Sequence, residues 1–259
     1  HMLVVCLQIF INSSIKLNHY LGGIKMYWEY YVMGVILIPG LILAIIAQAK
    51  VSFNYKKYSQ VMSKNNMKAC DVARLILDSA GLKQVQIKKI NGELTDNYDP
   101  KAQTVSLSSS VYDSTSVAAI GVACHEVGHA LQYAQNYAPV KIRMFLVRAC
   151  NISSTLLWPL VVIGLILNIG LNSVAGMVCM WCGVIIFGLS VIFNLVTLPV
   201  EYNASNRAKS ILSNAQILDS EEMEGVHKVL NAAALTYVAA LVVSILNLLR
   251  FIIVMKHND

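Results

Sequence analysis

The stretch that decides the interpretation of this chain is His125-Glu126-Val127-Gly128-His129. In an α-helix, residues i and i+4 lie on the same face, so both imidazoles can reach a single ion. Glu126 then lies beside that ion without being one of its ligands, where a carboxylate can take a proton from a bound water. From the His and Glu content of the chain, the pattern is expected by chance in on the order of one in several hundred such sequences. Two unrelated histidines beside a solvated glutamate are the alternative.

The neighbouring sequence predicts that this motif lies on a helix. Asp113-Ser114 offers an N-cap, and residues 117–123 lead into the motif without a proline. Further upstream, residues 67–80 carry apolar side chains at helical spacing and end at Gly81, which is a C-cap signal.

Two short strands are predicted between these helices. Residues 85–90 and 103–108 alternate like strands, Asn91-Gly92 is a strong hairpin-turn pair, and residues 96–100 are typical of a second turn. An exposed strand beside a metal site can pair with an extended peptide and hold it over the ion. The residues predicted to form such a substrate-binding edge are Thr104, Val105, Ser106 and Leu107. An ordinary edge strand with no binding role is the alternative.

The composition places part of the chain in lipid. Of its 259 residues, 56% are hydrophobic and only 13% are charged, whereas soluble domains are about a quarter charged. Four stretches are apolar enough to be predicted as membrane spans, with buried core helices as the alternative. They are residues 30–49, which include Pro39-Gly40; residues 156–171, extended by 152–155; residues 174–198; and residues 232–253, which carry Arg250 near their end.

The distribution of basic residues predicts the orientation of these spans. Residues 50–154 hold thirteen of the twenty Lys and Arg residues, and residues 200–231 hold three more. By the positive-inside rule, both segments are predicted to be cytoplasmic and both termini to face out, which four spans allow. The net charge of +6 then needs no nucleic acid, because the lysines just past residue 50 suit anionic lipid. A nucleic-acid surface is the competing interpretation, and no aromatic RNA-binding motif accompanies it.

A third ligand is needed to complete a catalytic zinc site, which usually has three protein ligands and a water. Glu201 stands out, because it follows Pro199 at the predicted inner end of the third span, where an unpaired carboxylate is costly. The alternative is a glutamate that interacts with the dipole of a helix that begins there. His227 lies on the predicted cytoplasmic side but has no supporting pattern.

Taken together, four stretches resemble the signatures of the YugP-like neutral zinc metallopeptidases of bacterial membranes. They are residues 122–132 (VACHEVGHALQ), 198–208 (LPVEYNASNRA), 97–100 (NYDP) and 229–239 (VLNAAALTYVA). The resemblance covers roughly residues 27–253. The segment Glu201-Tyr202-Asn203-Ala204-Ser205 is more distantly similar to the E-x-x-A-D element of HtpX-like membrane proteases, in which the final Asp supports a ligand histidine.

The resemblance implies a membrane zinc peptidase of the bacterial cytoplasmic membrane, with Zn²⁺ held by His125, His129 and Glu201 and with Glu126 catalytic. Peptides, proteins or membrane-protein segments would be its substrates. Because this chain has Ser205 where the HtpX-like element has Asp, support of a ligand histidine is expected to be weaker or to come from Asn203. The candidates for a hydrogen-bond donor to the oxyanion, which the sequence does not separate, are His227, Tyr202, Tyr237 and Arg207.

Two rival functions are weighed against this one. An intramembrane-cleaving protease would carry the motif inside a span, but only about eight apolar residues precede it and Gln132 and Gln135 follow closely. A scaffold or regulator with a structural zinc site would normally close that site with four protein ligands. A metal transporter fits poorly, because the predicted spans contain almost no ionisable residues.

The sequence therefore predicts a mainly α, four-helix integral membrane protein with a cytoplasmic, zincin-like α+β peptidase segment. His1-Met2 is typical of a cloning remnant, and residues 1–25 are predicted to be an extension upstream of Met26. The predicted segments are 26–50 (first span), 51–154 (peptidase segment), 155–199 (second and third spans), 200–231 (cytoplasmic segment with the third ligand) and 232–259 (fourth span and tail).

Overall fold

The computed structural model describes residues 34–171 and 174–257, and the chain is mainly helical. The predicted extension, residues 1–25, lies outside the described residues. In chain order the elements are α3 (Ile38–Tyr58), α4 (Ala69–Ser79), β1 (Gln86–Ile90), β2 (Asn97–Asp99), β3 (Thr104–Ser108), α5 (Ser109–Tyr112), α6 (Val117–Ala134), α7 (Ala138–Leu171), α8 (Val174–Asn214) and α9 (Ser220–His257).

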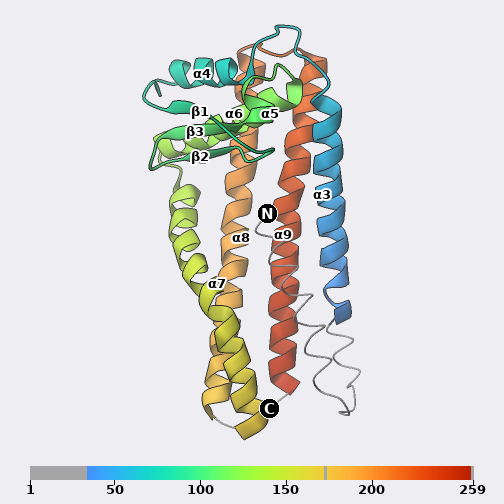
Figure 1. Cartoon of the computed structure of the whole chain (residues 1–259), viewed down its shortest axis with the longest axis vertical. Coiled ribbons are helices and arrows are strands. Elements are labelled where there is room, and N and C mark those ends of the chain that lie inside the picture. The colour runs from blue at the N-terminus through green and yellow to red at the C-terminus, as the bar shows by residue number, and fades with distance from the viewer. Residues whose placement is uncertain (1–33, 172–173, 258–259) are drawn as a thin grey trace.

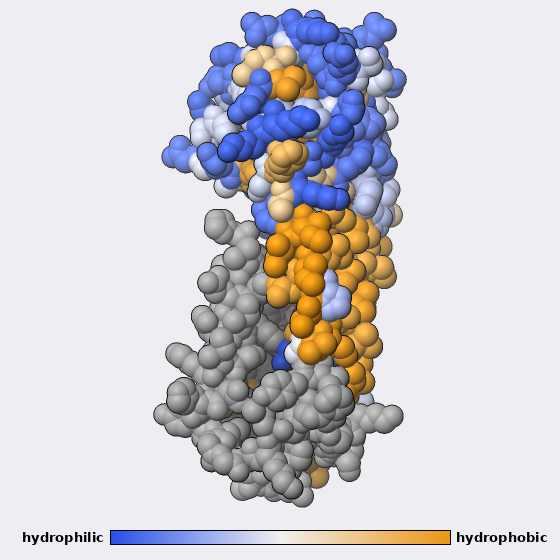
Figure 2. Space-filling view, turned by 90° about the vertical axis from the view of Figure 1, so that its right-hand side faces the viewer, coloured by the Kyte–Doolittle hydropathy of each residue, from blue (hydrophilic) through white to orange (hydrophobic). Residues whose placement is uncertain are grey.

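The elements separate into a compact head and a stalk of long helices. Figure 1 shows α4, α5, α6 and the three strands gathered at one end, from which α3, α7, α8 and α9 extend in roughly one direction. Figure 2 shows hydrophilic residues over the head and hydrophobic residues over the helices below it. Apolar helix faces that no protein covers are expected where a helix contacts lipid.

Three of the described helices are long and apolar enough to cross a membrane. They are Ile38–Tyr58 (α3), Trp181–Asn214 in α8 and Ser220–Ile253 in α9. The predicted first span, residues 30–49, begins outside the described residues, and α3 carries Pro39 in its first turn, where proline is well tolerated. The predicted span 156–171 lies on α7, and most of its side chains lie outside the described residues.

The long helices run without interruption from the stalk into the head. α8 continues through Pro199 to Asn214, and α9 is helical from Ser220 to His257. The segment boundaries predicted at 199/200 and 231/232 therefore fall inside continuous helices. The prediction of a helix start after Pro199 is wrong, although the third ligand still lies on the part of α8 that reaches the head.

The sheet differs from the predicted hairpin. Its strand order is β1-β3-β2, with β1 parallel and β2 antiparallel to β3. The chain therefore crosses from one edge of the sheet to the other after Asn91-Gly92, and β2 forms within residues predicted as a turn. The residues predicted as a substrate-binding edge, Thr104–Leu107, belong to the central strand, which is paired on both sides and largely buried, so that prediction is wrong. Pairing between distant segments decides which strand is central, and a single strand's alternation does not encode it.

The motif helix is α6, as predicted, and it forms the centre of the head. Its N-cap is Ser116, whose hydroxyl accepts a hydrogen bond from the Ala119 N–H at 3.3 Å, two residues beyond the predicted cap. Most of its side chains are buried and pack against α4, the sheet, α8 and α9. The motif is therefore on a rigid core element, which suits a site that needs fixed geometry.

A glycine sets the distance between α6 and α8. A Cβ added at Gly128 would lie 2.6 Å from the carbonyl oxygen of Ala204, a backbone atom of α8. Only glycine permits this approach. Gly128 adjoins His129, and Ala204 lies between Glu201 and Ser205 in the next turn of α8, so the contact brings the two halves of the predicted site together.

Candidate metal centre

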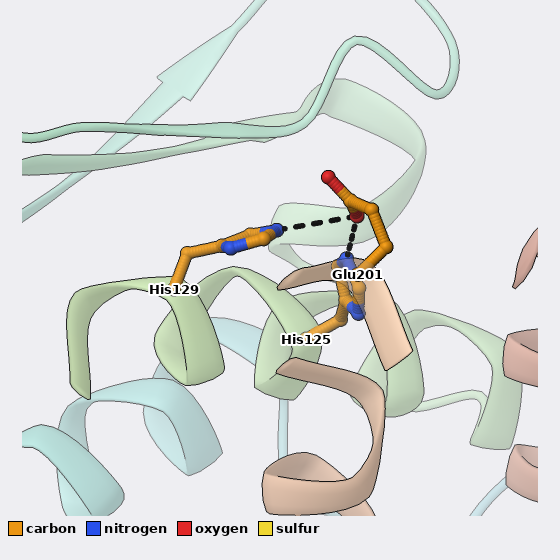
Figure 3. Close-up of side chains that lie close together, drawn as sticks. All are labelled: His125, His129 and Glu201. Atoms are coloured by element: carbon orange, nitrogen blue, oxygen red, sulfur yellow. Dashed lines mark hydrogen bonds and ion pairs between the residues drawn. The ribbon is translucent and has the colours of Figure 1, made fainter. Parts of the chain in front are cut away.

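Two helices bring the three predicted ligands to one place. His125 and His129 come from α6 and Glu201 from α8, and their ligand atoms all lie within 4.8 Å of one another. Figure 3 shows both imidazoles directed towards the Glu201 carboxylate. Nε2 of His125 lies 3.3 Å from Glu201 Oε2, and Nε2 of His129 lies 3.4 Å from the same oxygen. This was the decisive spatial requirement of the prediction, and the structure meets it.

These separations fit metal coordination better than direct ion pairing. Charge-assisted hydrogen bonds between nitrogen and a carboxylate measure about 2.7–2.9 Å. A tetrahedral zinc ion with bonds of about 2.0–2.1 Å instead holds its ligand atoms roughly 3.3–3.4 Å apart. Two imidazole nitrogens and a carboxylate oxygen are also among the usual zinc ligands. The two nitrogen–oxygen separations and the kinds of ligand atom therefore fit a zinc ion, and the two imidazole nitrogens lie within 4.8 Å of each other.

The second nitrogen of each imidazole has a hydrogen-bond partner, which leaves Nε2 directed towards the common point. Nδ1 of His125 lies 3.1 Å from the hydroxyl oxygen of Ser205, and Nδ1 of His129 lies 2.9 Å from Oε1 of Gln132. Such partners fix the orientation and tautomer of a ligand histidine. The sequence predicted that support at this position would be weaker than from an Asp or would come from Asn203; the Ser205 hydroxyl lies within hydrogen-bond distance of a candidate ligand, whereas Asn203 contacts Gln132.

A chain of hydrogen bonds determines the tautomer of His129. Arg207 can only donate, and its Nε lies 2.7 Å from Oδ1 of Asn203. That oxygen and the carbonyl of Val200 accept from Nε2 of Gln132, at 2.9 and 2.8 Å. Oε1 of Gln132 therefore faces His129 and accepts a proton from its Nδ1. It follows that the neutral imidazole of His129 carries its free lone pair on Nε2, as a metal ligand requires.

Glu201 carries a deeply buried carboxylate and lies well inside the length of α8, away from both helix ends. Its side chain is 3% exposed, and its other oxygen, Oε1, forms an ion pair with Nη1 of Arg143 at 2.9 Å. Because α8 is continuous here, Glu201 is not at a helix N-terminus, and the dipole alternative for this residue is wrong. A buried carboxylate needs partners, and here they include one guanidinium, two imidazoles and the hydroxyl group of Tyr237.

Glu126 lies beside the ligand group and is itself 8% exposed. Burial raises its pKa above the ordinary value for a glutamic acid, although the charges of His125 and His129 oppose that effect. A carboxyl group with a raised pKa is better able to exchange a proton near neutral pH than an ordinary surface glutamate.

The four predicted oxyanion donors have different positions. Tyr237 on α9 is half-buried and interacts electrostatically with Glu201, Arg143 and Glu126. Tyr202 is 41% exposed, and His227 is an exposed residue of α9. Arg207 is engaged by Asn203 and by Gln135, whose Oε1 lies 2.5 Å from Nη1. Of the four, Tyr237 is therefore the one that adjoins the ligand group.

Sequence reasoning missed two residues that contact this centre, Gln132 and Arg143. The contact of Gln132 with His129 could have been predicted, because Gln132 lies three residues after His129 and on the same side of α6. Arg143 carries no comparable signal, since its approach to Glu201 depends on the turn between α6 and α7.

Comparison with known proteins identifies the family to which the chain belongs. Residues 33–256 match the model of a family described as "Putative neutral zinc metallopeptidase". The chain is 43% identical over 221 residues to "Putative membrane protease YugP" of Bacillus subtilis (strain 168), covering 85% of this chain and 95% of the relative. No solved structure shows significant similarity to the present chain. The chain therefore belongs to this family of neutral zinc metallopeptidases.

Proposed function

We propose that this protein is a membrane-bound zinc endopeptidase whose zinc ligands are His125, His129 and Glu201. The observation that carries the proposal is the convergence of both Nε2 atoms on one oxygen of Glu201, at 3.3 and 3.4 Å, with Glu126 buried beside them. Zinc in such a site lowers the pKa of a bound water to about 7 and polarises the carbonyl of the scissile peptide bond.

The chain's own residues then move the protons and hold the ligands. Glu126 accepts the proton of the attacking water and later delivers it to the departing amine. Ser205 and Gln132 hold the two imidazoles in orientation, and Asn203 supports them through Gln132. Tyr237 is the proposed donor to the oxyanion of the substrate, because it adjoins both Glu201 and Glu126.

The cellular placement is also part of the proposal. Four spans, the zincin-like head on the cytoplasmic side of a bacterial inner membrane, and both termini outside agree with the basic residues of 50–154 and 200–231. The substrates would be peptides, proteins or segments of membrane proteins near the inner leaflet. Cysteine-accessibility labelling of single-cysteine variants in the head, on intact cells and on inverted vesicles, tests this orientation.

The two rival functions each lack support at a specific point. A structural zinc site is normally closed by four protein ligands, whereas the candidate group comprises three residues within the described part of the chain. An intramembrane protease would carry its motif on a span, but α6 is not one of the described helices that are apolar enough to cross a membrane.

The replacement Glu126→Gln tests the proposed reaction. Protein purified in detergent is loaded with zinc, and cleavage of casein and of a fluorogenic peptide mixture is measured beside the zinc content. We expect E126Q to keep one zinc per chain and to lose turnover. Glu93→Gln is the matched control, because Glu93 is an exposed residue of the loop after β1 and should be dispensable. Undiminished cleavage by E126Q would refute the role of Glu126, and wild-type protein that binds zinc without cleaving any substrate would favour the structural alternative.

A further inference from the structure

The two oxygens of Glu201 have different partners. Oε2 faces both candidate ligand histidines, whereas Oε1 forms an ion pair with Nη1 of Arg143 at 2.9 Å. The Arg143 side chain is 30% exposed, so the pair extends from the buried carboxylate towards the surface. Within the described residues, the ion pair with Arg143 is the only one that Glu201 makes with a Lys or Arg side chain.

The chain places Arg143 there by a tight turn. Only residues 135–137 separate α6 from α7, and Asn136 takes a left-handed conformation with φ of 55°. The N–H of Tyr137 donates to the carbonyl of Gln132 at 2.9 Å, which closes the turn against the end of α6. Arg143 lies in the second turn of α7, so the chain returns towards the histidines soon after leaving them.

Other side chains around the guanidinium define its surroundings. Tyr133, one turn after His129 on α6, interacts electrostatically with Arg143, and so does Tyr237 on α9. Arg143, carried by α7, thus pairs with Glu201 on α8 and interacts electrostatically with tyrosines on α6 and α9. A guanidinium presents a planar fork of donors in a fixed geometry, whereas a lysine ammonium is a point charge.

We propose that Arg143 is a positioning residue that reserves Oε1 of Glu201 and so makes this glutamate a ligand through one oxygen only. This inference rests on the proposed function. Carboxylates bind metal ions through one oxygen or through both. A second oxygen from Glu201 would become a fifth ligand and crowd the position that a catalytic zinc site keeps open for water. By binding Oε1, the guanidinium keeps that position free without contacting the metal or the substrate.

The test compares Arg143→Gln with Arg143→Lys and with Arg148→Gln as a matched control. Arg148 is an exposed arginine on the same helix, so R148Q removes the same charge from α7. All variants are expressed and purified with zinc present, because the ion then offsets the Glu201 charge that R143Q leaves without its guanidinium. The readouts are the number of light-atom ligands from zinc X-ray absorption, the visible spectrum after cobalt replacement, and peptide turnover.

We expect R143Q to hold one metal ion with five ligands in place of four, a weaker cobalt absorption, and turnover reduced about 10- to 100-fold. R143K still donates to Oε1 and should keep four ligands with most of the turnover, and R148Q should match the wild type. The proposal would be overturned if zinc kept four ligands in R143Q or gained a fifth ligand in R143K. It would also be overturned if R148Q showed the five ligands and reduced turnover expected of R143Q. Loss of folding in both Arg143 variants despite zinc would also overturn it, since that result indicates a purely structural ion pair.

The outcomes separate this inference from the proposed function. If E126Q is inactive while R143Q behaves as the wild type, only the role of Arg143 fails. If the wild type cleaves nothing, the peptidase proposal fails, and the ligand numbers of the Arg143 variants still decide how Glu201 binds the metal.

Discussion

Replacing Gly128 with alanine should separate α6 from α8 and disable the metal centre. The added Cβ would lie 2.6 Å from the carbonyl oxygen of Ala204, whereas ordinary contacts begin at 3.4 Å. Because the opposing atom belongs to a helix backbone, no side-chain rotation relieves the clash, and the helices must move apart by roughly 0.8 Å. A misplacement of about 1 Å at a catalytic site costs on the order of 100-fold in rate.

The expected change in stability is smaller than the change in rate. Overpacking of this kind lowers the free energy of unfolding by about 1–3 kcal/mol. Replacing a helical glycine by alanine raises it by about 1 kcal/mol, because alanine has the higher helix propensity. We therefore expect G128A to be destabilised by no more than about 2 kcal/mol, yet to lose about 100-fold in turnover.

Gly121→Ala is the matched control on the same helix. Its Cβ would meet a side-chain methyl of Val226 at 3.3 Å, which a small movement of that side chain can accommodate. The helix propensity gained is the same as for G128A. Thermal unfolding, zinc content and peptide turnover are measured on both variants in detergent. If G128A keeps wild-type turnover, or if G121A loses as much, the close approach of α6 and α8 does not set the geometry of the site.

Three further predictions concern the surroundings of the site and the bound metal. Ser205→Ala and Gln132→Ala each remove the partner of one histidine Nδ1 and should weaken zinc binding about 10- to 100-fold, measured by competition with a chromophoric chelator; unchanged affinity in both would show that these contacts do not matter. Removing zinc with a chelator should lower the free energy of unfolding by about 4 kcal/mol when zinc had been present at a thousandfold its Kd, with the helical circular dichroism retained below the transition. Burial raises the pKa of Asp96, despite the opposing hydrogen bonds from Ser108, so the folded protein holds this proton more tightly than the unfolded chain does and loses stability as pH rises from about 4 through the raised value. Asp96→Asn lacks that loss, so its stability relative to the wild type should increase from pH 4 to pH 6 in denaturant titrations, and a constant difference would contradict the reasoning.

The grouping of the three candidate ligands was largely predictable because its signals are local. A period of four residues places His125 and His129 on one face of any helix, whatever surrounds that helix. Glu201 was found because a carboxylate near the end of an apolar stretch is costly unless it has a partner. The apolar stretches predicted three of the helices that can cross a membrane from their composition alone.

The rest depends on contacts between distant segments. The alternation of residues 104–107 predicts a strand, but only the pairing with both β1 and β2 makes that strand central. Pro199 was taken to mark a helix start, yet α8 continues through it and packs against α6, α7 and α9, and this packing outweighs the loss of one backbone hydrogen bond. Arg143 reaches Glu201 through the turn at residues 135–137, and no pattern in its own neighbourhood indicates the contact.

Because α8 is one continuous helix, its rise fixes the distance between its first residue, Val174, and the candidate ligand Glu201. From Val174 to Glu201 it rises roughly 40 Å, at about 1.5 Å per residue, whereas the hydrocarbon layer is about 30 Å thick. If a hydrocarbon layer of that thickness began at Val174, Glu201 would lie roughly 10 Å beyond it on the same continuous helix. A polypeptide anchored in such a layer would then need to project only about three extended residues to bring a peptide bond to that height.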